Sequence, residues 1–474
     1  MFVGRKAELK LIREIMSRPK SKIIAINGRR RVGKSTLALK IGEGKRFFHF
    51  SGLSPNECST ARGQLNNFSR LLSIQLEKPV EKFSDWSYAL NYLSAHINPH
   101  EYTVILFDEM SWMSIGDKTF VSKLKVWWDT DISLRENVLL IFCGSVSTWI
   151  EKNIINSTAF YGRISAIINL SQLSIPESAE MLHKIGFKGS AFELYAILSI
   201  TGGIPWYLEQ INPALNVDQN IKSLCFLKNG ILFSEFDKIF NDLFSKGGDI
   251  YKKILDSLSD GMKTLIDIRK DVSYLHGGAF SDLLNNLSIC GFVSKHSQWS
   301  FKTGYIGKRS VYMICDPYVR FYLKYIKPNE NLIQNNRFEK GGLKLLSSYN
   351  NFIGFQMESL LLQNRNRLLE LMEIENPLMD NPYIQKPTAV KRGCQIDYLV
   401  QTRTNTLYVC EFKFHVGGIG TEIIDEMRQK IKRLSVPRGM AIVPVLFHMG
   451  EVNSPVYESN FFYKIIDLAD LLEE

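Results

Sequence analysis

The sequence contains few cysteines, and none of them stands in a metal-binding arrangement. Its 474 residues include seven cysteines, of which no two form a CxxC pair, and no histidine pair lies nearby at zinc spacing. A small disulfide-held protein is therefore excluded. We expect reduced thiols, several of them in apolar strands, at Cys58, Cys143, Cys225, Cys290, Cys315, Cys394 and Cys410.

Long apolar runs are missing as well. The stretches Val104–Phe107 and Val138–Cys143 have the length of strands, whereas a bilayer span needs about 20 apolar residues. The N-terminal segment already contains Arg5, Lys6 and Glu8 and lacks the apolar core of a secretion signal. The sequence therefore predicts a cytoplasmic protein with no membrane partner.

No segment has a composition typical of disorder. Hydrophobic residues make up 45% and charged residues 22%, as in ordinary globular proteins, and 474 residues are about three times the typical domain length. We therefore expect about three folding units. The formal net charge of +10 is compatible with a polyanionic partner, because lysine and arginine release counterions from phosphates, but it does not identify one.

The segment from residue 22 to 41 has the order strand, glycine-rich loop and helix. Lys22–Asn27 is an apolar, β-branched run, GRRRVGKST follows at 28–36, and a helical pattern begins at Leu37. In such a loop the backbone N–H groups and the helix N-terminus face phosphate, the lysine reaches the β and γ phosphates, and the serine ligates Mg²⁺. The sequence therefore predicts that ATP is bound by Gly28, Gly33, Lys34, Ser35 and Thr36.

A second apolar strand begins at Thr103 and ends in two acids. Asp108 is expected to hold Mg²⁺ through water, together with Ser35, and Glu109 is placed to polarise the attacking water. Adjacent acids in this position are typical of hydrolytic ATPases rather than kinases. The alternative is a pair of solvent-exposed acids at a strand end.

Further strands are expected at 47–50, 138–145 and 164–170, and their alternation with helices predicts a parallel sheet covered by helices. Ser145 falls at the strand end where such folds sense the γ-phosphate. Arg163 is a candidate transition-state arginine that acts in cis or on a neighbouring subunit. A structural or solvated arginine is the alternative.

Three segments resemble the archaeal-type ATPase family, a branch of the STAND group of AAA-related P-loop NTPases. They are FVGRKAEL at 2–9, YGR at 161–163 and GGIPWYL at 202–208. The resemblance implies that the segment around Arg5 lies beside the nucleotide base, and that Ser174–Gly186 and Ala191–Ile200 are helices of a lid. The segment DPYVRFY at 316–322 is similar to one that follows a winged helix in the same family.

The middle of the chain has the pattern of a winged helix. Helical patterns at 250–258, 264–270 and 279–287 are followed by short apolar strands at 291–294 and 311–315. The third helix has few cationic residues, so a packing or protein-docking wing is as well supported as a DNA-binding one. The candidate DNA contacts are His276, Lys295, Lys302, Lys308 and Arg309.

The C-terminal part contains two alternating strands, Gln395–Val400 and Leu407–Phe414, joined by a short turn. Because side chains alternate along a strand, Glu411 and Lys413 share a face, and Asp397 can approach them from the paired strand. Such a set suits metal-dependent phosphodiester hydrolysis, with two carboxylates for Mg²⁺ or Mn²⁺ and a lysine that orients or deprotonates water. The alternative is an ion pair of Lys413 on a sheet surface without activity.

Helical patterns at 355–371 and 422–434 flank these strands, and the whole segment resembles the αβββαβ core of the PD-(D/E)xK nuclease superfamily. The resemblance implies that Asp397, Glu411 and Lys413 form its motif and that Glu358 is a further metal-binding acid on the preceding helix. Gln429 and Lys430, on the following helix, are either phosphate contacts or part of a solvated face.

Together these features predict an α/β multidomain protein: a P-loop NTPase core with a parallel sheet at 1–170, a helical lid at 171–247, a winged helix at 248–330 and a restriction-endonuclease-like α/β domain at 335–474. The leading hypothesis is an ATPase coupled to an Mg²⁺- or Mn²⁺-dependent DNA nuclease, of the kind associated with mobile elements or defence. The alternative is a nucleotide-controlled switch that scaffolds partners without cutting DNA. The expected partners are ATP, DNA and either a second copy of the chain or another protein.

Overall fold

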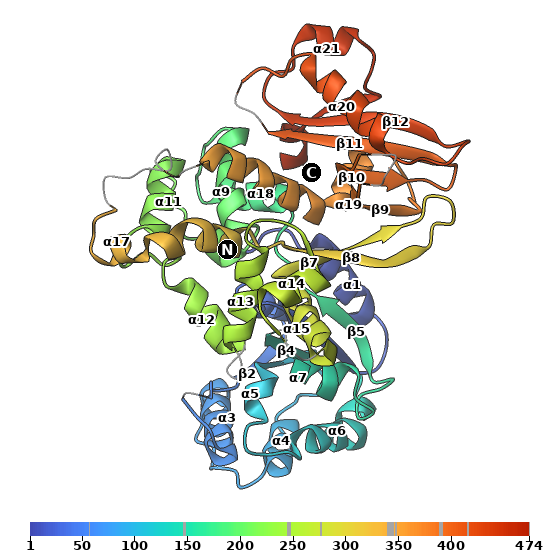
Figure 1. Cartoon of the computed structure of the whole chain (residues 1–474). Helices are drawn as coiled ribbons and strands as arrows, with labels where there is room; N and C mark the ends of the chain where they lie inside the picture. Colours follow the sequence, from blue (N-terminus) through green and yellow to red (C-terminus); the bar gives the residue numbers. More distant parts are fainter. Residues whose placement is uncertain are drawn as a thin grey trace. The chain divides into compact units, whose positions relative to one another are not determined.

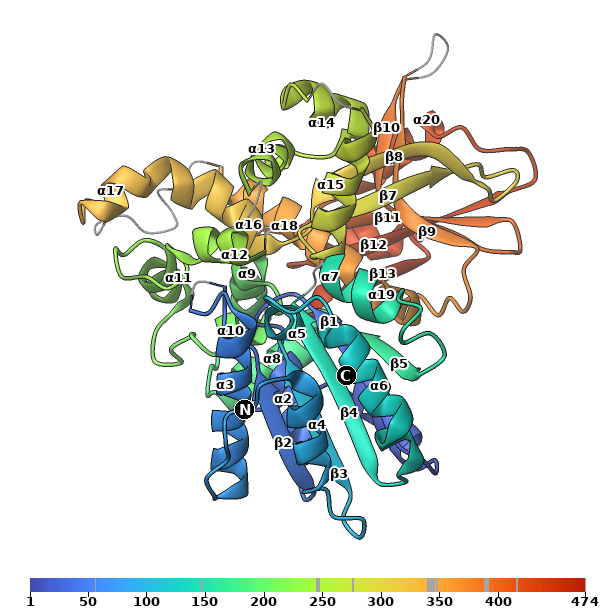
Figure 2. The same cartoon turned by 90° about the horizontal axis from the view of Figure 1, so that it is seen from below.

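The computed structural model shows two compact units, Met1–Gln172 and Leu173–Glu474 (Figures 1 and 2). It describes residues 1–473 except 56, 146–147, 244–247, 275–276, 339–345, 347, 388–391 and 415–416. The division at 172 lies close to the predicted end of the ATPase core at 170. The boundaries predicted inside the second unit stay predictions. Within the described ranges no helix is long and apolar enough to cross a membrane.

The first unit is built on a parallel sheet with the strand order β2-β3-β4-β1-β5. Its central strands are runs of apolar, largely β-branched residues that are buried on both faces, as a parallel sheet covered by helices requires. The parallel sheet expected from the sequence is therefore confirmed. The strands are β1 (Lys22–Gly28), β2 (Arg46–Ser51), β3 (Thr103–Asp108), β4 (Val138–Ser145) and β5 (Ile164–Asn169).

Helices cover this sheet and share its apolar core. Trp86 and Phe120, from two different helices, meet edge to face with ring centroids 4.8 Å apart, and both belong to the core that includes Phe48 and Phe107 of the strands. The helices and turns are α1 (Lys6–Met16), α2 (Lys34–Gly42), α3 (Ala61–Leu76), α4 (Trp86–Ser94), α5 (Met110–Met113), α6 (Phe120–Thr130), η1 (Ile132–Leu134), α7 (Thr148–Ile150) and η2 (Glu151–Ile155).

The second unit begins with helices whose starts are encoded locally. Ser174 and Ser190 each form a capping box with the glutamate three residues later, which fixes the N-termini of α8 and α9. Gly202 ends α9 with a φ of 59°, and a Cβ on Gly203 would lie 2.1 Å from the Leu173 carbonyl oxygen, so the turn requires both glycines. The helices are α8 (Ile175–Lys184), α9 (Ala191–Thr201), α10 (Pro205–Leu208), α11 (Val217–Cys225) and α12 (Glu235–Leu243).

The next segment contains the three helices and the two later strands that the sequence predicts, and it adds a two-residue strand, β6, that the sequence analysis does not expect. Its three strands form an antiparallel sheet in the order β6-β8-β7. His276 lies outside the described residues, as do the side chains of Lys308 and Arg309. The elements are α13 (Gly248–Leu258), β6 (Lys263–Thr264), α14 (Leu265–Asp271), α15 (Gly277–Ile289), β7 (Val293–Trp299) and β8 (Ile306–Ile314).

The C-terminal segment forms a mixed sheet with the order β13-β12-β11-β10-β9. Strands β9, β10 and β11 are antiparallel neighbours, whereas β12 and β13 are parallel to β11. The strands are β9 (Met379–Gln385), β10 (Cys394–Gln401), β11 (Thr406–Phe414), β12 (Ala441–Met449) and β13 (Lys464–Asp467). The helices and turns are α16 (Pro317–Phe321), η3 (Tyr322–Ile326), η4 (Lys327–Asn329), α17 (Glu330–Gln334), α18 (Tyr349–Gln363), α19 (Arg365–Leu371), α20 (Glu422–Arg433), α21 (Ser454–Glu458) and η6 (Leu468–Leu472).

The β7–β8 hairpin packs against the C-terminal sheet, and Figure 1 shows the hairpin running beside β9. Trp299 and Phe301 belong to the apolar core of that sheet. Trp299 Nε1 donates to Gln401 Oε1 at 2.7 Å, and Gln401 Nε2 donates to the Phe301 carbonyl at 2.9 Å. The sequence leaves two roles open for the predicted wing, DNA binding and packing or protein docking. The contacts of the β7–β8 hairpin favour packing.

Candidate nucleotide and metal sites

The P-loop joins β1 to α2 and has the shape that the sequence predicts. Gly33 has a φ of 91°, and a Cβ on Gly28 would lie 2.5 Å from the Leu170 carbonyl oxygen, so both positions require glycine. Lys34 is 6% exposed, and its Nζ donates to the carbonyls of Gly28 at 2.9 Å and Arg29 at 3.1 Å. The loop therefore holds a buried ammonium beside the N-terminus of α2, where the phosphates of a nucleotide are expected.

The acid at the end of β3 faces the first turn of α2. Ser35 Oγ donates to Asp108 Oδ2 at 2.6 Å, which brings together the two predicted Mg²⁺ ligands. Although burial opposes ionisation, interactions with His49 and Ser35 and the charge of Lys34 keep the pKa of Asp108 low. A hydroxyl and an ionised carboxylate are hard oxygen donors, so this pair fits Mg²⁺.

Glu109 follows in a left-handed conformation, with a φ of 49°. Its backbone N–H donates to Asp108 Oδ1 at 3.0 Å, and its carbonyl accepts from Trp112 at the start of α5. The bend turns the chain sharply after β3, and Glu109 is partly exposed, unlike the buried Asp108. Its role as the water-polarising group remains a prediction.

His49 also belongs to this site, although no motif in the sequence points to it. It lies on β2, next to β3, and its Nε2 is 3.7 Å from Asp108 Oδ2. That buried nitrogen has no hydrogen-bond partner within the described part of the protein. In the sequence, His49 stands out only as a polar residue between Phe48 and Phe50 near the carboxyl end of a strand. Its closeness to Asp108 becomes evident only when β2 is known to pair with β3.

The remaining predicted residues of this unit occupy different environments. The Arg5 guanidinium donates to the carbonyls of Val32 at 3.0 Å and Ser171 at 2.7 Å, and it thereby ties the P-loop to the end of the unit. Thr36 is exposed in the first turn of α2. Ser145 ends β4 opposite Gly28, and its side chain lies outside the described ones.

Arg163 forms a two-point ion pair with Asp129 of α6. Its Nε and Nη2 donate to the two carboxylate oxygens at 2.7 and 2.9 Å. This contact, with help from Lys125, lowers the pKa of Asp129 to about 2. The pairing accounts for Arg163 as a structural residue, and its catalytic role stays a prediction.

The second site lies on β10 and β11, which pair with Tyr398 opposite Cys410. Asp397 is 8% exposed, and its Oδ2 accepts a hydrogen bond from the Phe412 backbone N–H at 3.0 Å. Glu411 is 4% exposed. The structure thus brings both predicted acids to one part of the sheet and buries them there.

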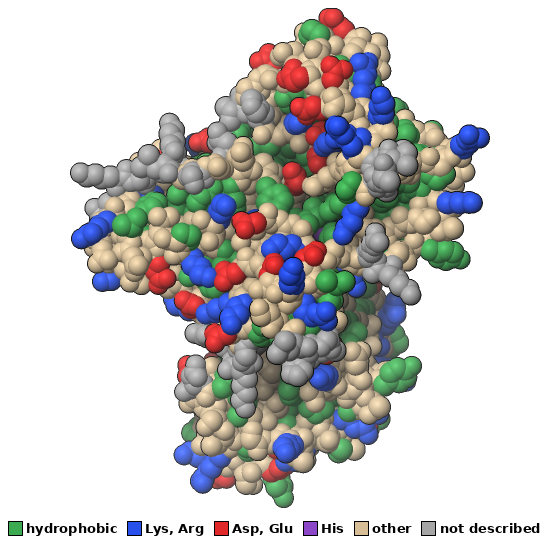
Figure 3. All heavy atoms as spheres, viewed as in Figure 1, with side chains coloured by type: hydrophobic (Ala, Val, Ile, Leu, Met, Phe, Trp, Pro, Cys, Tyr) green, Lys and Arg blue, Asp and Glu red, His purple; other side chains and the backbone are tan. Residues whose placement is uncertain are grey.

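Two lysines neutralise these acids. Lys430 of α20 donates to Glu411 Oε2 at 2.5 Å and lies 3.7 Å from Asp397 Oδ1. Lys413 Nζ lies 3.6 Å from Glu411 Oε1 and donates to Glu426 of α20 at 2.7 Å. Lys430 is thus part of the site rather than of a solvated helix face. In the upper part of Figure 3, where Figure 1 draws α20 and β11, acidic and basic side chains lie next to one another.

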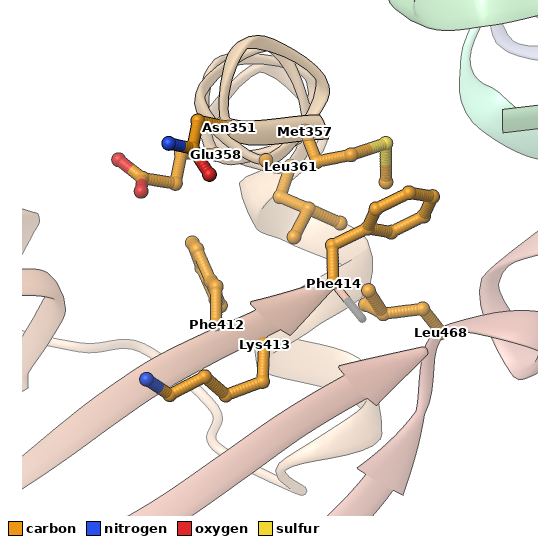
Figure 4. A pocket seen from close by; sticks show the side chains of 9 residues that line it. Asn351, Met357, Glu358, Leu361, Phe412, Lys413, Phe414 and Leu468 are labelled. Carbon is orange, nitrogen blue, oxygen red and sulfur yellow. The ribbon is translucent and has the colours of Figure 1, made fainter. Parts of the chain in front are cut away.

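Glu358 lines a cavity of about 180 Å³ between α18 and β11. Figure 4 shows Glu358 on the helix, with Phe412 and Phe414 projecting from β11 towards the helix and Lys413 leaving the other side of the strand. Burial, together with the charges of Asp397 and Glu411, raises the pKa of Glu358 to about 8. The third predicted acid therefore lies within electrostatic reach of the other two.

The donor set fits a divalent cation only in part. Burial and the neighbouring Asp397 raise the pKa of Glu411 to about 7, and burial raises the pKa of Asp397. Among the described residues no three His, Cys, Asp or Glu side chains are grouped closely enough to hold a metal ion. The two strand acids are suitable hard ligands, but Lys430 lies between them.

Comparisons with known proteins agree with the first site. Residues 2–211 match the family model described as an ATPase domain predominantly from Archaea. The uncharacterized protein MJECL04 of Methanocaldococcus jannaschii is 27% identical over 363 residues, which cover 76% of each chain. With the P-loop geometry, the family match shows that the N-terminal part of the chain is a P-loop ATPase domain.

Solved structures resemble this chain at low sequence identity. The Walker-type ATPase PABY2304 of Pyrococcus abyssi has a TM-score of 0.49 and 15% identity, and the match covers 68% of this chain and 96% of that one. The ORC2 protein of Aeropyrum pernix has a TM-score of 0.44 and 14% identity, with 70% and 94% covered.

Proposed function

We propose that this protein couples its ATPase to a DNA nuclease that depends on Mg²⁺ or Mn²⁺ and is formed by the C-terminal sheet. The observation that supports the nuclease most strongly is the convergence of Asp397, Glu411 and Lys413 on adjacent strands, with a helix on either side in the chain. We propose the same domains as the sequence predicts: a helical lid at 171–247, a winged helix at 248–330 and a nuclease-like domain at 335–474.

In the ATPase, each polar group of the P-loop has a separate task. Lys34 neutralises the phosphates, while Ser35 and Asp108 hold the Mg²⁺ that accompanies ATP. Glu109 orients and polarises the attacking water, which the bend after β3 allows. Arg5 acts indirectly, because its bond to the Val32 carbonyl fixes the loop.

In the nuclease, Asp397 and Glu411 would hold the divalent cation, and Glu358 of α18 would add negative charge near it. When bound, such a cation polarises a phosphodiester and lowers the pKa of attacking water. Although burial opposes its charge, the contacts with Glu426 and Glu411 raise the pKa of Lys413. Lys413 therefore orients water and stabilises phosphate as a charged donor rather than removing a proton.

The net charge of +10 and the two phosphate-directed sites support DNA as a partner. We propose mobile-element or defence biology as the setting, from the resemblance of the C-terminal segment to nucleases. A second copy of the chain or another protein completes the proposed assembly. The β7–β8 hairpin packs on the C-terminal sheet through Trp299, while the candidate contacts Lys295 and Lys302 stay exposed. The DNA contact that cleavage requires is proposed for the surface around β11 and α20.

A nucleotide-controlled switch without cleavage is the second candidate. The observation that favours it is the neutralisation of Asp397 and Glu411 by Lys430, which gives the site a stable ion-paired state without metal. In that case ATP turnover controls a partner-binding surface.

The two candidates differ in an assay with the purified full chain. Plasmid and branched DNA are incubated with Mg²⁺ or Mn²⁺, with and without ATP, and with EDTA as the control. The nuclease proposal expects nicking or linearisation that EDTA abolishes. Intact DNA under every condition, with metal binding demonstrated separately, would support the switch.

A further inference from the structure

The most informative feature outside the predicted motif is the place of the Lys430 ammonium. Its Nζ lies 2.5 Å from Glu411 Oε2 and 3.7 Å from Asp397 Oδ1, and the two carboxylates are only 5% and 9% exposed. A divalent cation shared by the same oxygens would lie about 2 Å from each of them. The ammonium therefore occupies the region that the cation needs.

Lys430 can leave this region, whereas Lys413 is held by a second partner. Lys413 is fixed by Glu426 at 2.7 Å on α20 and lies further from Glu411, at 3.6 Å. Among the described residues, Lys430 Nζ is hydrogen-bonded or ion-paired with the two site acids alone, and its side chain is 26% exposed. A flexible four-carbon stem with one exposed edge allows the ammonium to turn towards solvent or a bound anion.

The charges oppose simultaneous binding of Lys430 and a metal. A cation with two positive charges next to an ammonium in a buried site is strongly repelled, because little water screens the two charges. A phosphodiester that arrives at the same edge attracts the ammonium. Displacement of Lys430 by a phosphate thus removes the obstacle to metal binding.

We propose that Lys430 closes the metal site in the DNA-free protein, and that a bound phosphodiester draws its ammonium away so that DNA and divalent metal bind cooperatively. This inference rests on the proposed nuclease site and adds its regulation. In the absence of DNA, the Lys430 ammonium prevents Asp397 and Glu411 from binding a metal ion. Because coupling between two ligands is reciprocal, metal must also tighten DNA binding.

The test measures Ca²⁺ binding to the full chain by calorimetry, without nucleotide and with or without a blunt DNA duplex. Lys430→Met should bind Ca²⁺ about tenfold more tightly than wild type in the absence of DNA, within the usual range of coupling factors. Wild type should gain a similar factor when the duplex is added, and Lys430→Met should gain much less. Lys432→Met, which removes an exposed charge from the same helix, should behave as wild type.

Lys430→Arg keeps the charge and controls for the fold. It should retain weak Ca²⁺ binding and a gain on addition of DNA, and circular dichroism should show native helix content in every variant. Equal or weaker Ca²⁺ binding by folded Lys430→Met in the absence of DNA would overturn the proposal. Tighter Ca²⁺ binding by Lys430→Met, with no DNA cleavage by wild type, would support the role of Lys430 and reject the nuclease. DNA cleavage by wild type, without tighter Ca²⁺ binding by Lys430→Met, would support the nuclease and reject the role of Lys430.

Discussion

At the P-loop, substitutions at positions 34 and 109 should separate nucleotide binding from hydrolysis. Lys34→Ala should remove ATP affinity, because the phosphates lose a buried cation beside the N-terminus of α2. Glu109→Gln should keep ATP bound and lose hydrolysis, because the amide cannot polarise water as a carboxylate does. Filter binding and phosphate release measure the two properties, and unchanged hydrolysis in both variants would contradict the assigned roles.

His49 gives a second prediction at the same site. Its buried Nε2 lies 3.7 Å from Asp108 Oδ2, beyond hydrogen-bond distance, so the imidazole stands directly beside the carboxylate that is proposed to support Mg²⁺. His49→Ala should raise the Mg²⁺ concentration for half-maximal ATP hydrolysis about tenfold. His100→Ala, which alters an exposed histidine, should leave that concentration unchanged. The same Mg²⁺ dependence in both variants would show that His49 does not support the metal.

A site residue could be predicted from the sequence where its neighbours in the chain form a recognisable motif, and not where its role depends on contacts with distant segments. The glycines and the lysine of the P-loop follow from a continuous pattern, and they lie where expected. His49 and Lys430 contact their partners only through strand and helix packing across 59 and 19 residues (108 − 49 and 430 − 411). Lys430, Lys432 and Arg433 look alike in the sequence, and only the docking of α20 shows which of them faces β11.

Among the helices, α9, α16 and α18 meet at one buried polar group. Gln356 Nε2 donates to the carbonyls of Ser199 at 2.6 Å and Pro317 at 2.8 Å, while its Oε1 accepts from Arg320 at 2.8 Å. Figure 1 shows α9 and α18 side by side. This one amide therefore connects the helix that precedes the Gly202–Gly203 turn with the helix that carries Glu358.

Gln356→Leu should lower the free energy of unfolding by about 3 kcal/mol or more, because two carbonyls and part of the buried Arg320 charge lose their partner. Gln429→Leu, an exposed change on α20, should stay within about 0.5 kcal/mol of wild type. Urea unfolding followed by circular dichroism measures both changes. Equal midpoints for the two variants would show that the contact among the three helices carries little stability.

The elements themselves were more predictable than their packing. Apolar runs of strand length and local caps, such as the Ser174 capping box, give their signal within a few residues. The burial of Trp299 in the C-terminal core arises between segments about 100 residues apart, and alternation within β7 does not reveal it. The sequence alone therefore leaves both DNA binding and packing open for the predicted wing. The contacts of the β7–β8 hairpin favour packing.

Across the chain, the two candidate sites belong to different compact units, with Asp108 in the first and Asp397 in the second. In the P-loop half, the sequence could place Ser35 and Asp108 together as the expected metal ligands, because each motif adjoins its own strand. In the C-terminal half the sequence predicts the motif acids and names Lys430 as a phosphate contact or solvated residue, but it does not predict that Lys430 lies between the acids. Side-chain chemistry at the two sites should therefore be separable by mutation.

The most direct measurement is metal-dependent DNA cleavage by wild type, Asp397→Asn, Glu411→Gln and Lys413→Ala, with ATP hydrolysis followed in the same samples. Asp425→Asn, an exposed acid on α20, is the matched control. We predict that wild type and the control cut DNA with Mg²⁺ or Mn²⁺, that loss of either acid abolishes cutting, and that Lys413→Ala loses most of the rate. ATP hydrolysis should persist in all of them. Cleavage that is equal in all variants, or absent from wild type with metal shown to be bound, would contradict a nuclease at this site.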